Sequence, residues 1–248
     1  MNETIARRED PPVPLLVPVL LSLVAGYLDS YTYLSLFGLF AAQVTGSFVI
    51  AGAEFVTSDF GIAGKLIAIA AFVAAAAVTA ALIIAAREAR YAALPWMLAL
   101  ETLLLAGFAA LMLFGPAVRD ARDWHGILAG VFAAMAMGAQ SVLVRMLMKD
   151  IPQTNVMTGN MTQLGIAVTE LIAARRRFDH SRHGESAMRE FDHARDRLIT
   201  VSAIAVGFLA GAAAGAVAFA TIGLHGALAA VAIVGALALW ALARQGQD

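Results

Sequence analysis

Cysteine is absent from this chain of 248 residues, and charged side chains are scarce. Without cysteine there is no disulfide, no thiolate metal site and no cysteine nucleophile. Asp, Glu, Lys and Arg make up 14% of the residues, against about 25% in an average soluble domain. Seventeen basic and 18 acidic residues give a net charge of −1, which argues against nucleic-acid binding. The composition therefore excludes a soluble enzyme, a disordered chain and a nucleic-acid binder.

Long hydrophobic runs stand in place of the missing charges, and 60% of the residues are hydrophobic. A spanning helix needs about 20 predominantly apolar residues. Six segments meet this requirement, and they predict an all-α polytopic integral membrane protein with one membrane domain over 1–248. The predicted spans are 13–37, 62–86, 92–114, 125–148, 198–221 and 226–243, and Gly223–Gly226 forms the turn between the last two.

Two further segments, 39–57 and 153–174, are apolar enough to be buried but carry several polar side chains. If both turn back without crossing, and the N-terminus is cytoplasmic, 14 basic residues lie inside and three outside. If both cross, the split is 13 to four. Both topologies put the termini and a polar loop at 175–197 on the cytoplasmic side of a bacterial inner membrane.

The two halves of the chain resemble each other. Val44-Thr45-Gly46-Ser47 in the first half matches Met157-Thr158-Gly159-Asn160 in the second, at an offset of 113 residues. Repeat 1 covers 13–114 and repeat 2 covers 125–243. Each repeat is predicted to hold three spanning helices and one short polar, broken or re-entrant helix, so that the halves are inverted. The alternative is eight spanning helices in two parallel repeats of four.

Four motifs make the chain similar to the YoaK-like family of bacterial membrane proteins, which has no established activity. They are Ala25-Gly26-Tyr27-Leu28-Asp29, Gln43-Val44-Thr45-Gly46-Ser47, Met137-Gly138-Ala139-Gln140-Ser141 and Val156-Met157-Thr158-Gly159-Asn160. The family pattern at the second motif is Asn-Met-Thr-Gly-Asn, so Gln43 and Ser47 depart from it. The resemblance implies a polytopic membrane protein and leaves its activity open.

The candidate site combines the polar residues of these motifs with two acidic residues. A carboxylate in a membrane is costly and by default marks a function. Hydroxyl and amide groups beside a glycine satisfy freed backbone groups or meet a ligand, and a half-helix amino end favours an anionic group. The alternative interpretation is ordinary helix packing. The candidate substrate-binding residues are Asp29, Tyr33, Gln43, Thr45, Gly46, Ser47, Glu101, Gln140, Asn155, Thr158, Gly159, Asn160 and Thr162.

These features favour a secondary transporter or permease for a small polar or weakly anionic solute, coupled to protons through Asp29 or Glu101. A non-transporting partner or assembly subunit is the second interpretation, and a membrane-embedded lipid-modifying enzyme is the third. The sequence shows no cofactor motif, no metal-ligand spacing and no catalytic order of residues. The expected partners are the lipid bilayer and a small solute, with a homodimer left open and no nucleic acid.

Overall fold

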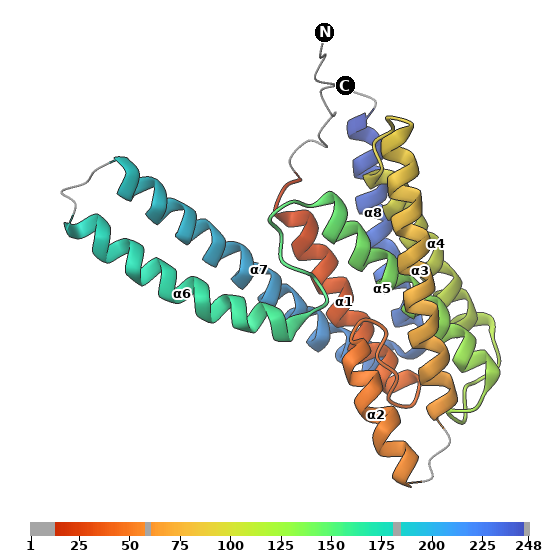
Figure 1. Cartoon of the computed structure of the whole chain (residues 1–248). Coiled ribbons are helices and arrows are strands. Elements are labelled where there is room, and N and C mark those ends of the chain that lie inside the picture. The colour runs from red at the N-terminus through yellow and green to blue at the C-terminus, as the bar shows by residue number, and fades with distance from the viewer. Residues whose placement is uncertain (1–12, 58–60, 181–184, 246–248) are drawn as a thin grey trace.

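All regular structure in the described residues, 13–57, 61–180 and 185–245 of a computed structural model, is helical (Figure 1). The chain forms eight α-helices and one short 3-10 helix in these ranges. They are α1 (Leu16–Ser35), α2 (Val44–Thr57), α3 (Ile62–Glu88), α4 (Leu94–Phe114), α5 (Trp124–Leu147), α6 (Met157–His180), α7 (Glu185–Ile222), η1 (Gly223–Gly226) and α8 (Ala227–Gln245).

The long apolar helices support a multi-pass membrane protein. Five segments are long and apolar enough to cross a membrane, namely α1, α3, α4, α5 and the 61-residue stretch Glu185–Gln245. That last stretch contains α7 and α8, and η1 separates them at the turn expected from the sequence. Gly223 has φ +57°, a left-handed conformation that glycine adopts without strain.

Hydrogen bonds between helix ends define the two ends of the bundle. Gln245 at the end of α8 donates to the Ala92 carbonyl before α4, and Arg87 at the end of α3 donates to the Met146 carbonyl near the end of α5. Figure 1 shows that α1 begins at this same end, which we term the proximal end. At the opposite, distal end, Tyr31 in the last turns of α1 donates to the Leu224 carbonyl over 2.9 Å. The helices α1, α4 and α7 therefore run toward the distal end, while α3, α5 and α8 run back.

Two pairs of parallel helices pack with their backbones almost in contact. A Cβ atom added at Gly26 of α1 would lie 2.1 Å from the Phe208 carbonyl oxygen of α7. One added at Gly138 of α5 would lie 2.4 Å from the Phe72 carbonyl oxygen of α3. Only glycine, which has no side chain, lets two helix backbones come this close. Helices in membranes commonly associate through such contacts of small residues.

The segment expected to be a cytoplasmic loop, 175–197, is helical at both ends. The helix α6 continues to His180 and α7 begins at Glu185; residues 181–184 lie outside the described ones. The two helices run antiparallel, and Arg197 is 2.8 Å from Glu170. Charged residues outnumber apolar ones here, so a search for apolar spans places the start of α7 too late. Pairs at helical spacing, such as Arg189 with Glu185, support the helix instead.

Candidate functional site

The carboxylate of Asp29 marks the start of α2 inside the bundle. Asp29 is 2% exposed, and its Oδ1 accepts hydrogen bonds from the amides of Ala42 (2.7 Å) and Gln43 (3.2 Å). It lies six residues before the end of α1, which is about 9 Å from the distal end at 1.5 Å per residue. The chain therefore turns back into the bundle after α1 before α2 begins. Oδ2 of Asp29 is buried and makes no hydrogen bond within the described residues.

A corresponding polar cluster marks the start of α6. Gln140 is fully buried on α5, and its amide nitrogen donates to the Leu21 carbonyl (3.0 Å) and to the Thr154 hydroxyl (2.8 Å). The Ser22 hydroxyl lies 3.0 Å from the Thr154 carbonyl oxygen and 2.8 Å from that of Ile204. Ser22 is six residues after the start of α1, so this cluster is about 9 Å from the proximal end.

The residues directly before α6 complete this cluster. Ser141 Oγ lies 3.3 Å from Asn155 Oδ1 and 3.4 Å from Gln153 Oε1. Asn155 is buried, and Oε1 of Gln140 is buried without a hydrogen bond among the residues that the structure describes. Amides and hydroxyls here take the place that the carboxylate of Asp29 has before α2.

Equivalent hydrogen bonds close the two turns that precede α2 and α6. The Ser47 hydroxyl donates to the Phe40 carbonyl (3.1 Å), and the Asn160 amide donates to the Gln153 carbonyl (2.7 Å). Each spans seven residues, and the two are 113 residues apart. The backbone amides of the same two residues bond to the carbonyls four residues earlier, both over 3.2 Å. The two matching motifs therefore form the same local hydrogen bonds.

The amino ends of α2 and α6 approach α1 from opposite ends of the bundle. Ser22 and Asp29 are seven residues apart and therefore lie on one face of α1, about 10 Å apart along its axis. In Figure 1 both helices begin beside α1 and run outward, α2 toward the distal end and α6 toward the proximal end. The positive ends of two helix dipoles thus point into the protein, where they favour an anionic or carbonyl group.

Glu101 is a second buried carboxyl, in the first half of α4. It is fully buried, and both of its oxygens lack a hydrogen-bond partner in the described ranges. The helix α4 packs on α5 and α8, and a Cβ at Gly107 would touch the Phe132 ring at 2.6 Å. A carboxyl group buried at membrane depth without hydrogen-bond partners is costly in free energy, so its presence indicates a function. No hydrogen bond among the described residues joins Glu101 to Asp29.

The remaining candidate residues divide into buried supports and exposed positions. Gly46 faces the Phe40 ring, while Gly159 has only the Val156 side chain within 4 Å of an added Cβ. Thr45, Thr158 and Thr162 are exposed, and Thr162 bonds to a carbonyl of its own helix. Tyr33 is 44% exposed and stacks on Phe40. The three threonines therefore face away from the buried polar clusters.

Sequence reasoning missed Ser22 and Thr154, which are both fully buried. The spacing of seven between Ser22 and Asp29 is a signal for a shared helix face. Thr154 gives no such signal, because only the folded chain brings it to Gln140 and Ser22.

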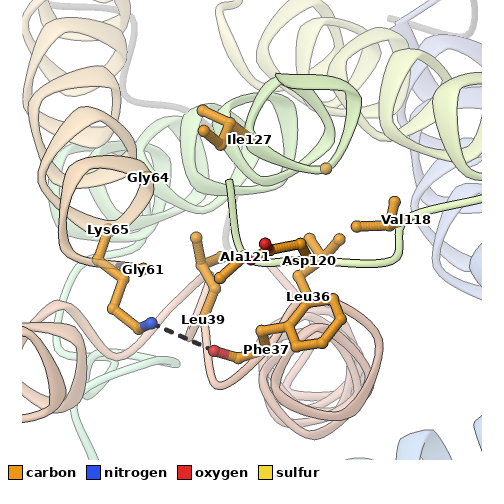
Figure 2. A pocket seen from close by; sticks show the side chains of 11 residues that line it. Leu36, Phe37, Leu39, Gly61, Gly64, Lys65, Val118, Asp120, Ala121 and Ile127 are labelled. Carbon is orange, nitrogen blue, oxygen red and sulfur yellow. Dashed lines mark hydrogen bonds between the residues drawn. The ribbon is translucent and has the colours of Figure 1, made fainter. Parts of the chain in front are cut away.

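A buried ion pair was also missed. Lys65, one of the three basic residues that lie outside in the non-crossing topology, is 2% exposed, and its Nζ lies 2.6 Å from Glu54 Oε1. Nζ also donates to the Phe37 carbonyl over 3.2 Å, as Figure 2 shows. A cavity of about 20 Å³ adjoins the ammonium group. The side chain of this basic residue therefore lies in the protein interior and not in solvent.

The loop on the other side of this cavity is held by Asp123. Its Oδ2 accepts hydrogen bonds from the amides of Arg119 (2.6 Å) and Asp120 (3.2 Å), which lower the pKa of Asp123. Among the described residues no group of three or more His, Asp or Glu side chains could hold a metal ion.

The comparisons identify a family. The family model described as "Protein of unknown function (DUF1275)" matches residues 17–241. The chain belongs to this family. The match confirms the expected resemblance to an uncharacterised family of membrane proteins. No curated protein and no solved structure matches the chain.

Proposed function

We propose that this member of the DUF1275 family is a secondary transporter or permease for a small polar or weakly anionic solute. One observation carries the proposal: two helices, α2 and α6, begin inside the bundle and point their amino ends toward α1 from opposite ends. Discontinuous helices of this kind form the substrate sites of many secondary transporters, where half-helix amino ends meet anionic groups.

The proposal includes two inverted repeats, each of three spanning helices and one re-entrant helix. Matched contacts support this arrangement. Glycines 112 residues apart, Gly26 and Gly138, make close backbone contacts of α1 with α7 and of α5 with α3. The helices α1 and α5 run in opposite directions, as inverted repeats require. The capping bonds of Ser47 and Asn160 support the same pairing.

The proposed location is a bacterial inner membrane with both termini in the cytoplasm. Basic residues of the proximal end support this orientation, because the positive-inside rule favours them on the cytoplasmic side. Arg87, Arg90, Arg145 and Lys149 lie in or beside the ends of α3 and α5. The α6–α7 hairpin adds further arginines at this end.

The proposed solute site lies between the two amino ends. Asp29 Oδ2 and Gln140 Oε1 are the buried acceptors that remain there, and Gln43 and Asn155 stand at the two turns. Thr45, Thr158 and Thr162 are outside this proposed site because their side chains are exposed. No residue receives a catalytic role.

Glu101 and Asp29 are the proposed proton-coupling carboxyls. Each keeps at least one buried oxygen without a partner among the described residues. A carboxyl in this position binds a proton when the surroundings are apolar and releases it when water reaches it. Coupling then follows from the alternation of the bundle between two states.

The test uses purified protein in liposomes that contain a pH-sensitive dye. A gradient of each member of a panel of small amino acids and hydroxycarboxylates is imposed, and the expected result is protein-dependent acidification of the lumen by at least one solute. Glu101→Gln should abolish the acidification but retain exchange of the labelled solute, and Asp29→Asn is the second variant. Thr102→Val is the matched control, since the Thr102 hydroxyl bonds only to the Leu98 carbonyl of its own helix.

Acidification that persists in both acid variants contradicts proton coupling and favours a facilitator. If no solute of the panel moves, the assembly-subunit alternative becomes the better explanation. One observation favours that alternative: Gly52 of α2 and Gly165 of α6, again 113 residues apart, are exposed and have nothing within 4 Å of an added Cβ. Exposed glycine faces of this kind accommodate another helix.

A further inference from the structure

The ion pair between Glu54 and Lys65 joins three parts of the fold. Glu54 lies on α2, Lys65 lies in the first turns of α3, and the Lys65 ammonium also bonds to the Phe37 carbonyl just after α1. The side chain of Lys65 is 2% exposed and that of Glu54 15%. The helix α2 packs mainly on α3, so this ion pair is one of the main contacts that hold α2 in place.

The backbone beside the pair is shaped to admit it. A Cβ atom at Gly61 would lie 2.9 Å from Lys65 Nζ and 3.1 Å from Glu54 Oε2. The same atom would lie 3.2 Å from Ala121 Cβ in the α4–α5 loop. Glycine therefore lets the pair sit against the start of α3 and beneath that loop.

The small cavity connects the pair to the re-entrant turn. Its lining includes Lys65 and Gly61 on one side and Leu39 of the segment between α1 and α2 on the other (Figure 2). Leu39 is three residues before Ala42, whose amide bonds to Asp29. With a volume of about 20 Å³, the cavity has room for one water molecule. The cavity therefore lies between Lys65 and the segment that leads to Asp29.

The second half of the chain holds apolar residues at the matching positions. Glu54 matches Ala167 at the offset of 113 residues, and Ala167 is fully buried. Phe72 and Phe208 occupy matching glycine contacts, which are 136 residues apart. By that offset Lys65 matches Val201, which is also buried. An apolar junction is thus compatible with this architecture.

A buried ion pair is costly in free energy, and apolar residues can hold a helix in the same position. Removing two charges from water costs about as much as their attraction returns, so apolar replacements are often neutral or stabilising. Breaking such a pair by losing one partner, in contrast, strongly destabilises the closed arrangement. This combination suits a contact that opens and closes.

We infer that the Glu54–Lys65 pair is the distal gate of the solute path. With the pair formed, α2 lies against α3 and water does not reach Asp29 from the distal end. With the pair broken, α2 moves away from α3 and opens this route. The inference rests on the proposed function, because it gives the solute path its distal entrance.

The experiment measures how fast a single cysteine reacts with a charged, water-soluble maleimide. The reporter is Ala42→Cys, a small change at a buried position beside Asp29, and the chain has no other cysteine. The protein is used at full length in lipid nanodiscs, where both ends are accessible. Glu54→Gln and Lys65→Met should each increase the labelling rate about tenfold or more, because either change breaks the ion pair by removing one of its two charges.

A charge-swapped protein, with Glu54→Lys and Lys65→Glu together, should return labelling toward the slow rate of the parent. The matched control is the exposed pair Arg197 and Glu170, which has the same chemistry on the α6–α7 hairpin. Arg197→Met and Glu170→Gln should leave the rate unchanged. Unchanged labelling in both single variants, or equal acceleration in the control pair, would overturn the gate.

The readout needs no solute, so its outcome is separate from that of the transport assay. Faster labelling together with absence of any transport would mean that the ion pair only holds α2 in place, and it would refute the proposed transport function. Solute transport with unchanged labelling would refute the gate alone. If the single variants do not fold, fast labelling of the folded charge-swapped protein would likewise count against it.

Discussion

The contact between α1 and α7 gives the sharpest test of the fold, through the change Gly211→Ala. A Cβ atom at Gly211 would lie 1.9 Å from the Leu23 carbonyl oxygen and 2.7 Å from its carbon. Ordinary contact begins near 3.4 Å, so the two helices must separate by about 1.5 Å to admit one methyl group. Both sides of the contact are backbone, and no side-chain rotation relieves it.

The expected cost is at the upper end of that for overpacking, about 3 kcal/mol. Alanine is the better helix former, which returns up to about 1 kcal/mol. A net loss of about 2 to 3 kcal/mol corresponds to a fall in melting temperature of about 4 to 12 °C for a chain of this size. Gly207 and Gly215 continue the same contact with Val19 and Tyr27, so the strain does not relax along the helix.

The assay is thermal unfolding of the detergent-solubilised protein, followed by loss of the monodisperse chromatographic peak. The control is Gly165→Ala, because an added Cβ there has nothing within 4 Å. This control should melt at or slightly above the temperature of the parent. Equal melting of the two variants would refute the close approach of α1 and α7, and with it the position of Ser22 beside the start of α6.

Two further predictions concern α2 and α6. Single cysteines at Arg90 and Gln245 should label from one side of the membrane and a cysteine at Ala63 from the other; labelling of Arg90→Cys and Gln245→Cys from opposite sides would mean that α6 crosses. Asn160→Leu should lower the stability by about 1 to 3 kcal/mol, because the Gln153 carbonyl loses its donor, and unchanged thermal unfolding would show that this bond is not formed.

Most spans could be predicted from the sequence because hydrophobic length is a direct physical requirement of a bilayer. The predicted segments 62–86, 92–114 and 125–148 differ by at most two residues from α3, α4 and α5 at either end. The turn at Gly223 was equally visible, since a run of 46 uncharged residues is too long for one helix. The start of α7 was not visible, because its first turns are charged and lie beside α6.

The candidate site was predicted only in part, and helix geometry explains the rest. Thr45 and Ser47 are two residues apart, about 200° around a helix, so one of them must point away from any common site. The sequence does not say which one does. The structure buries Ser47 and Asn160 and exposes Thr45 and Thr158, which assigns the inward direction to the capping residues.

Lys65 shows why a count of basic residues on each side of the membrane does not reveal which of them are buried. A basic residue near the end of a predicted span counts as an exposed loop residue, and nothing in the local sequence contradicts this. Its burial depends on Glu54, eleven residues away on another helix, and on the glycine at position 61 that leaves room for both. Such a pairing exists only after α2 has folded back onto α3.

Under the proposed repeat arrangement, the charges near the two re-entrant helices are distributed unequally. The first half holds Asp29 and the Glu54–Lys65 pair, whereas the second half has Ser141, Ala167 and Val201 in corresponding places. Because charges at membrane depth are costly, two halves that served the same purpose would both have lost them. The first half would then respond to protons and ions, while the second half would move by repacking apolar and amide groups. A carrier built in this way would use its charged half to set the direction of transport.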